Sequence, residues 1–210
     1  MPDPVNTALL AYMLNGATPV YGRTKAQKTP FFVELKLSRE HLAGPTFSFK
    51  RYHKGPWSQA VWDSLDYLVA NEFIRRDYSV APRGTLLLEL VEMLRAANGR
   101  VFEIMDQVLA FCKKRSGEQL IEAAYQEVIE LPSGEKATLA DIPHNVMILS
   151  PLETALQISS DLRALIANEL RTTPAQIVAA KKRFPKVEKA ALARLYAGQQ
   201  YTRRTQEIGV

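Results

Sequence analysis

The chain has 210 residues, of which 47% are hydrophobic and 23% are charged, and its net charge is +5. This composition supports a sizeable buried core and excludes a chain that is disordered throughout. No apolar run approaches the roughly 20 residues that a membrane-spanning helix needs, and the first residues lack the features of a signal peptide. We therefore expect a cytoplasmic protein without a membrane segment. The single cysteine, Cys112, excludes an internal disulfide and a cysteine-rich zinc site.

The excess positive charge lies at one end of the sequence. From residue 151 onward, ten basic residues face five acidic ones, whereas residues 1–150 contain 17 of each. The position of charge matters more than its sum for binding polyanions. Any electrostatic contact with nucleic acid is therefore expected in the C-terminal part.

The first two predicted elements are helices. Asp3 suits an N-cap, Pro4 suits the first helical turn, and Gly16 suits the end of this short helix. A second helix is predicted to start at Thr24. Pro30 is expected to break or kink it, because proline lacks the backbone N–H that a helix interior uses.

The next segment contains the parts of a winged-helix unit. Aromatic and basic residues alternate over 47–52 and predict a short strand that ends at a turn over 54–56. Ser58 suits the N-cap of a helix. The core face of that helix is predicted to consist of Val61, Trp62, Leu65, Leu68 and Val69. An extended segment at 73–80, a turn and a helix at 86–94 follow.

Two more helices are predicted at 101–114 and 117–130. Residues 132–149 are the most loop-like and are predicted to be a linker that closes a core domain over residues 1–131. Residues 150–210 are predicted to form a basic extension of three helices, near 151–170, 174–184 and 186–206. The predicted fold is mainly α with a small β-hairpin: a winged-helix-like core followed by a C-terminal helical extension.

The helix after Ser58 occupies the place of a DNA recognition helix. Between Ser58 and Asn71 it has no lysine or arginine, and it carries Asp63 and Asp66. Recognition helices offer Arg, Lys, Asn or Gln to base edges, and carboxylates oppose approach to a phosphate backbone. The helix is therefore poorly suited to read DNA and better suited to contact a protein.

Several short motifs resemble those of the Panacea antitoxin and YwgA-like group of small bacterial proteins. They are Lys25-x-Gln27-Lys28, then Gly55-Pro56-Trp57-Ser58, then the close at residues 81–84. The resemblance covers about residues 5–130 and implies a winged-helix-like domain that binds a partner protein, usually a toxin encoded beside it. The motifs and nearby aromatic residues indicate these contact residues: Lys25, Gln27, Lys28, Tyr52, Gly55, Pro56, Trp57, Ser58 and Tyr67.

The basic tail supports a second hypothesis, in which the protein binds DNA or RNA. Six of its residues are candidates for phosphate contacts: Lys181, Lys182, Arg183, Lys186, Arg203 and Arg204. Phe184, Tyr196 and Tyr201 are available to stack on exposed bases. Three other interpretations of the tail stay open: a solvated helical face, a homodimer contact, and a contact with an acidic patch on the partner.

The residue patterns of common enzymes are absent from the sequence. His41, His53 and His144 have no metal-ligand spacing, and no nucleophile elbow or phosphate-cradling glycine loop occurs. We therefore predict a protein without enzymatic activity, cofactor or metal. The leading hypothesis is a protein-binding module of antitoxin or adaptor type, and the alternative is a winged-helix regulator that binds nucleic acid.

Overall fold

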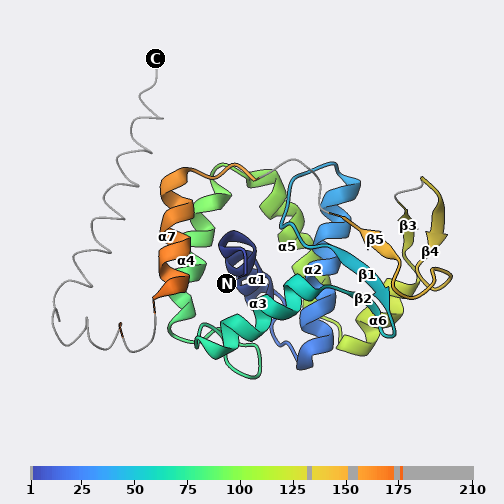
Figure 1. Cartoon of the computed structure of the whole chain (residues 1–210), viewed down its shortest axis with the longest axis horizontal. Coiled ribbons are helices and arrows are strands. Elements are labelled where there is room, and N and C mark those ends of the chain that lie inside the picture. The colour runs from blue at the N-terminus through green and yellow to red at the C-terminus, as the bar shows by residue number, and fades with distance from the viewer. Residues whose placement is uncertain (1, 132–133, 151–155, 173–175, 177–210) are drawn as a thin grey trace, which may run out of the picture. The chain divides into compact units, whose positions relative to one another are not determined.

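The computed structural model describes residues 2–131, 134–150, 156–172 and 176 (Figure 1). The chain divides into two compact units, residues 1–171 and 172–210, and the named helices and strands all belong to the first. Its helices are α1 Pro4–Gly16, α2 Gly22–Arg39, α3 Gln59–Ala70, α4 Gly84–Arg95, α5 Gly99–Lys113, α6 Gly117–Tyr125 and α7 Ser160–Arg171. Its strands are β1 Phe49–Tyr52, β2 Gly55–Trp57, β3 Val128–Glu130, β4 Lys136–Thr138 and β5 Met147–Leu149. The prediction of a mainly helical fold with a small β-hairpin is confirmed.

Helix α1 lies at the centre of the helical part. It packs against α2, α3, α4, α5 and α7, and Figure 1 shows it between these helices. Its residues 7–14 are all buried, because other helices surround it. The predicted cap is confirmed, since the N–H of Asn6 donates to Oδ1 of Asp3 at 2.8 Å. None of the described helices is long and apolar enough to cross a membrane.

Helix α2 runs continuously through Pro30, so the predicted break is wrong. Proline leaves one helical hydrogen bond unmade, but burial of the helix outweighs this loss. Phe31, Phe32 and Val33 follow Pro30 directly and are buried. α2 packs against α5, α6 and β2, and so connects the helices to the hairpin.

Strands β1 and β2 form the hairpin, which lies before α3. Antiparallel pairing places Lys50 opposite Trp57 and Tyr52 opposite Gly55, and β5 adds to the other side of β1. Between α3 and α4, the sequence predicts an extended segment over residues 73–80. At that place the structure has one isolated antiparallel bridge, between Ile74 and Val80.

Two predicted boundaries are also corrected. The helix predicted over 117–130 ends at Tyr125, because β3 pairs there with β4. The segment 132–149 is not a linker in its described part, since it supplies β4, β5 and the buried Leu139, Ile142 and Ile148. The core therefore extends well beyond residue 131.

The first helix of the predicted extension belongs to this core. α7 packs against α1 and α4, and it lies beside α4 in Figure 1. It begins at Ser160, later than predicted. Just before it, the side chain of Asn98 pairs with the backbone of Gln157. Nδ2 of Asn98 donates to the carbonyl of Gln157 at 2.7 Å, and the N–H of Gln157 donates to Oδ1 of Asn98 at 2.9 Å. The other two predicted helices, near 174–184 and 186–206, lie outside the described residues apart from residue 176.

Candidate functional site

The first sequence motif lies on α2 and is buried. Lys25, Gln27 and Lys28 expose only 1%, 3% and 3% of their surface. Each side chain donates a hydrogen bond to a backbone carbonyl outside its own helix. Buried polar groups are stable only when such partners are present. The motif therefore joins separate segments of the fold.

Gln27 holds the start of α3. Its Nε2 donates to the carbonyl of Ser58 at 3.0 Å, and the N–H of Ser58 donates to its Oε1 at 3.1 Å. The Ser58 hydroxyl accepts from the N–H of Val61 at 3.3 Å and caps α3, as predicted. This one junction thus ties β2 and α3 to α2.

Lys28 supports the hairpin from its buried side. Its Nζ donates to the carbonyl of Pro56 at 2.6 Å. Gly55 has φ +82°, a conformation that favours glycine, and a Cβ there would lie 3.7 Å from Cε of Lys28. Burial, with Arg51 and Lys54 nearby, lowers the pKa of Lys28 from 10.5 to about 7.

Lys25 connects the loop before α2 with the end of α5. Its Nζ donates to the carbonyl of Pro19 at 2.8 Å and to that of Lys113 at 3.4 Å. The last carbonyls of a helix lack helical partners and favour a nearby cation. Burial lowers the pKa of Lys25. The Lys25-x-Gln27-Lys28 motif and the motif over residues 55–58 therefore meet in space, through the bonds of Gln27 and Lys28. The buried residues of both motifs hold the fold together.

Only three of the nine predicted partner-binding residues keep exposed area. Tyr52 is 43% exposed, and Trp57 and Tyr67 are half-buried. Tyr67 is already engaged, because its hydroxyl donates to the carbonyl of Leu170 at 2.6 Å and holds α7. The other six are buried: Lys25, Gln27, Lys28, Gly55, Pro56 and Ser58.

Four side chains at the hairpin form what we call the aromatic face: Tyr52, His53, Trp57 and His144. The ring of Tyr52 lies 4.6 Å from that of His53 and 5.7 Å from that of Trp57, between centroids. The rings of His53 and His144 are 4.7 Å apart. Alternation along β1 buries Phe49 and Arg51 and leaves the opposite side of the strand in solvent. The hairpin therefore presents clustered rings to solvent.

The loop before β5 brings His144 to this face. Asn145 donates its N–H to the carbonyl of Arg51 at 2.7 Å, and Arg51 donates its own N–H to the carbonyl of Val146 at 2.8 Å. Tyr125 adds a further link, since its hydroxyl donates to the carbonyl of His53 at 3.0 Å. His144 was not among the predicted site residues, because no local pattern indicates that 132–149 pairs with β1.

Helix α3 presents acidic groups beside the hairpin. Asp63 and Asp66 are exposed, and Asp66 pairs with Arg23 at 2.6 Å. Trp62 was predicted to be core, and this is wrong: it is half-buried, with the Arg23 guanidinium 4.0 Å from its ring centroid. α3 carries no lysine or arginine, and its exposed Gln59 donates to the carboxylate of Asp63 at 2.6 Å.

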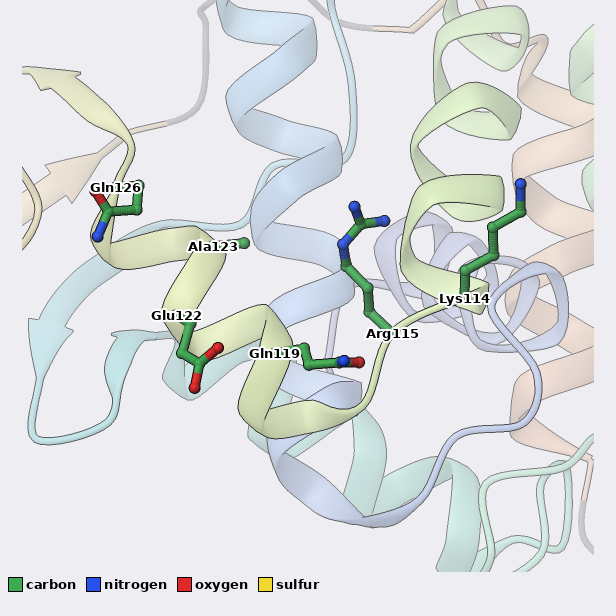
Figure 2. Close-up of a pocket in the computed structure, with 6 residues that line it drawn as sticks. All are labelled: Lys114, Arg115, Gln119, Glu122, Ala123 and Gln126. Carbon is green, nitrogen blue, oxygen red and sulfur yellow. The ribbon is translucent and has the colours of Figure 1, made fainter.

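A hollow of about 540 Å³ lies where α5 ends and α6 begins. Its lining is Lys114, Arg115, Gln119, Glu122, Ala123 and Gln126. Figure 2 shows these side chains spread along the junction, with no convergence on one point. Arg115 is held aside, because its guanidinium lies 3.7 Å from the ring of Phe111 and donates to the carbonyl of that residue at 2.9 Å. The hollow is open and its lining side chains do not converge on one point, so it does not resemble a small-molecule site.

The buried titratable groups lie apart from these surfaces. Burial raises the pKa of Glu34 to about 8, although Oε1 accepts from the N–H of Phe47 at 2.9 Å. Burial also raises the pKa of Cys112 to about 12, so its thiol stays protonated at neutral pH. Cys112 is a free and buried cysteine. Within the described ranges, no group of three or more His, Cys, Asp and Glu side chains is arranged to hold a metal ion.

The predicted nucleic-acid contacts, Lys181, Lys182, Arg183, Lys186, Arg203 and Arg204, all lie outside the described residues. The described fold and surface define a mainly helical domain whose β-hairpin carries an aromatic face above buried cationic supports. Comparisons of the chain with protein-family models, with curated proteins and with solved structures found no match.

Proposed function

We propose that this chain is a cytoplasmic, non-enzymatic protein-binding module of antitoxin or adaptor type, and that the aromatic face holds the partner. The observation that carries the proposal is the clustering of Tyr52, His53, Trp57 and His144 on one exposed side of the hairpin. Tyrosine and tryptophan are enriched among the residues that dominate binding energy in protein interfaces. Motif resemblance to antitoxins of the Panacea group agrees with this role.

The support beneath the hairpin favours a binding role as well. Hydrogen bonds from Gln27 to Ser58 and from Lys28 to Pro56 fix the strand that carries Trp57. Side chains held in place before binding lose less conformational entropy when the complex forms. A preorganised face of this kind suits recognition of one partner, such as a toxin encoded nearby.

The proposal is tested by substitutions confined to the aromatic face, which should abolish binding of the partner. The full chain carrying Tyr52→Ala and Trp57→Ala is compared with wild type by affinity capture from the native cell extract. Tyr21→Ala is the matched control, because Tyr21 is 78% exposed and is not part of the aromatic face. We expect one nuclease-resistant protein partner to bind wild type and the control and to be lost from the double variant. Equal recovery with all three would contradict the proposal.

A second candidate function is nucleic-acid binding through the C-terminal part. The observation that favours it is the confinement of all excess positive charge to the residues after 150. Phosphate contacts release counterions, so such binding weakens steeply with salt. Capture of nucleic acid alone, released by moderate salt, would favour this function over the first.

A further inference from the structure

The hairpin concentrates positive charge. Residues 47–58 contain Lys50, Arg51 and Lys54 and no acidic residue. Lys28 lies beneath the same turn, with its Cε close to Gly55. Lys50 and Lys54 are exposed, whereas Lys28 and Arg51 are buried. Lys50, Arg51 and Lys54 are therefore three cationic side chains around one short turn, and Lys28 beneath it, with a pKa that burial lowers to about 7, is protonated only in part at neutral pH.

None of these four side chains has a carboxylate partner among the described residues. Lys28 donates to the carbonyl of Pro56, and Nε of Arg51 donates to the carbonyl of Leu139 at 3.2 Å. Elsewhere in the same unit, Arg39 and Arg95 are paired with carboxylates at 2.8 Å and 2.7 Å. Carbonyl groups satisfy the donors but do not neutralise the charge, so the hairpin keeps a positive field.

We infer that the aromatic face binds an acidic segment of a partner protein, whose carboxylates lie opposite Lys50 and Lys54 and whose apolar side chains pack on Tyr52 and Trp57. This inference rests on the proposed function and specifies the chemistry of the partner. Register supports the arrangement, because Lys50 is directly opposite Trp57 and the two side chains share a face with Tyr52. The buried Arg51 contributes to the field without touching the partner.

The neighbouring surface favours a short acidic segment over a nucleic acid. Farther along α3, Asp63 and Asp66 are exposed, and Asp66 is paired with Arg23. A duplex carries one charge per about 1.7 Å and extends past a single hairpin, so it would meet these carboxylates. A peptide whose acidic residues are confined to the hairpin avoids that repulsion. Complementary charge of this kind also selects against wrong partners.

The test measures binding of a labelled, short, glutamate-rich peptide with one tyrosine to the full chain by fluorescence anisotropy. A glutamine-for-glutamate version of the peptide and a single-stranded oligothymidine serve as comparison probes. The chain is used as wild type, as Lys50→Glu with Lys54→Glu, and as Lys113→Glu with Lys114→Glu. The last pair is the matched control, because both lysines are exposed at the end of α5 and make no ion pair among the described residues.

We expect the glutamate peptide to bind wild type and the control equally, and to bind the hairpin variant about tenfold or more weakly. The glutamine peptide is expected to bind wild type and the control far more weakly than the glutamate peptide does. Equal binding of the two peptides, or equal loss in both charge variants, would overturn the inference. If oligothymidine binds more tightly than the glutamate peptide, and the hairpin variant loses that binding, the surface would be assigned to phosphates instead.

A separate readout distinguishes this inference from the proposed function. Each charge variant is also used in the partner capture, with thermal unfolding as the control for folding. A partner that is lost from Tyr52→Ala with Trp57→Ala but retained by Lys50→Glu with Lys54→Glu would overturn the acidic segment and leave the protein-binding role standing. Loss of the partner from both hairpin variants, with retention by the α5 control, supports the acidic segment.

Discussion

The side chain of Gln27 pairs with both backbone groups of Ser58, at 3.0 Å and 3.1 Å, across 31 residues of sequence. This geometry imitates the pairing of two adjacent strands, although one partner is a side chain on a helix. It places the strand that ends at Trp57 at a fixed position on α2. The relationship explains why two short motifs that are distant in sequence act as one unit.

Replacing Gln27 by leucine is expected to destabilise the fold strongly. The substitution leaves the buried N–H of Ser58 without its partner and weakens the satisfaction of its carbonyl. We expect a loss of about 3 kcal/mol in the free energy of unfolding, measured by chemical denaturation. Gln126→Leu is the control, because Gln126 is exposed, and it should change stability little. Equal effects of the two substitutions would contradict the role of the pairing.

Lys28 is expected to make stability rise with pH. Its pKa is lowered to about 7 in the folded protein, from the ordinary 10.5. Between these values the unfolded chain binds more protons than the folded one, so the free energy of unfolding increases with pH over that window. Lys28→Met should lack this contribution. The check is the difference between wild type and variant in denaturation curves across the window; a flat difference would contradict the lowered pKa.

Glu34 is expected to act in the opposite direction. Its pKa is raised to about 8, from 4.5, by burial. Between these values the folded protein binds more protons than the unfolded chain, so this residue lowers the free energy of unfolding as pH rises. Glu34→Gln keeps an acceptor for the N–H of Phe47 and removes the titration. The variant should gain stability over wild type as pH rises from 4.5 to 8, and a constant difference would argue against a buried acid.

Tyr67 is expected to hold α7 on the core. Tyr67→Phe removes only the hydroxyl that donates to Leu170, and we expect a loss of about 1 kcal/mol in the free energy of unfolding. Faster hydrogen exchange of the α7 amides should accompany it. Tyr21→Phe serves as the control, since that tyrosine is largely exposed. Unchanged exchange in α7 would show that the bond is dispensable.

The basic C-terminal residues give a prediction that separates the two candidate functions. If the alternative function holds, replacing Lys181, Lys182 and Arg183 by alanine should weaken binding of nucleic acid. It should also reduce the dependence of log affinity on log salt by about three units. The pair Lys113→Ala and Lys114→Ala controls for lost charge. Unchanged affinity in the triple variant removes these residues from the nucleic-acid hypothesis.

Helix starts were predictable because their signals are local. Asp3 caps α1, and Ser58 caps α3, as their side-chain oxygens and positions indicate. Pro30 misled the prediction, because a local rule about proline was outweighed by burial on the surrounding helices. The end of α6 at Tyr125 depends on pairing between β3 and β4, which no helical pattern reveals.

The candidate site was predictable in part. Tyr52 and Trp57 were identified by residue type and motif, and they do lie on an exposed face. Lys25 and Lys28 were expected at the surface, since lysine is rarely buried, yet carbonyl partners from distant segments hold them inside. His144 was missed because it is distant from the hairpin in sequence, and only the fold brings it to His53.

The most direct test of the central claim is site-specific photo-crosslinking within the native cell. A photoreactive amino acid replaces Tyr52 in one strain and Tyr21 in another, because both side chains are exposed and only Tyr52 belongs to the aromatic face. We predict that position 52 crosslinks to a single protein and that position 21 does not. Crosslinking of that protein from position 21 alone, or of nucleic acid from position 52, would contradict the claim that the hairpin is the partner-binding surface.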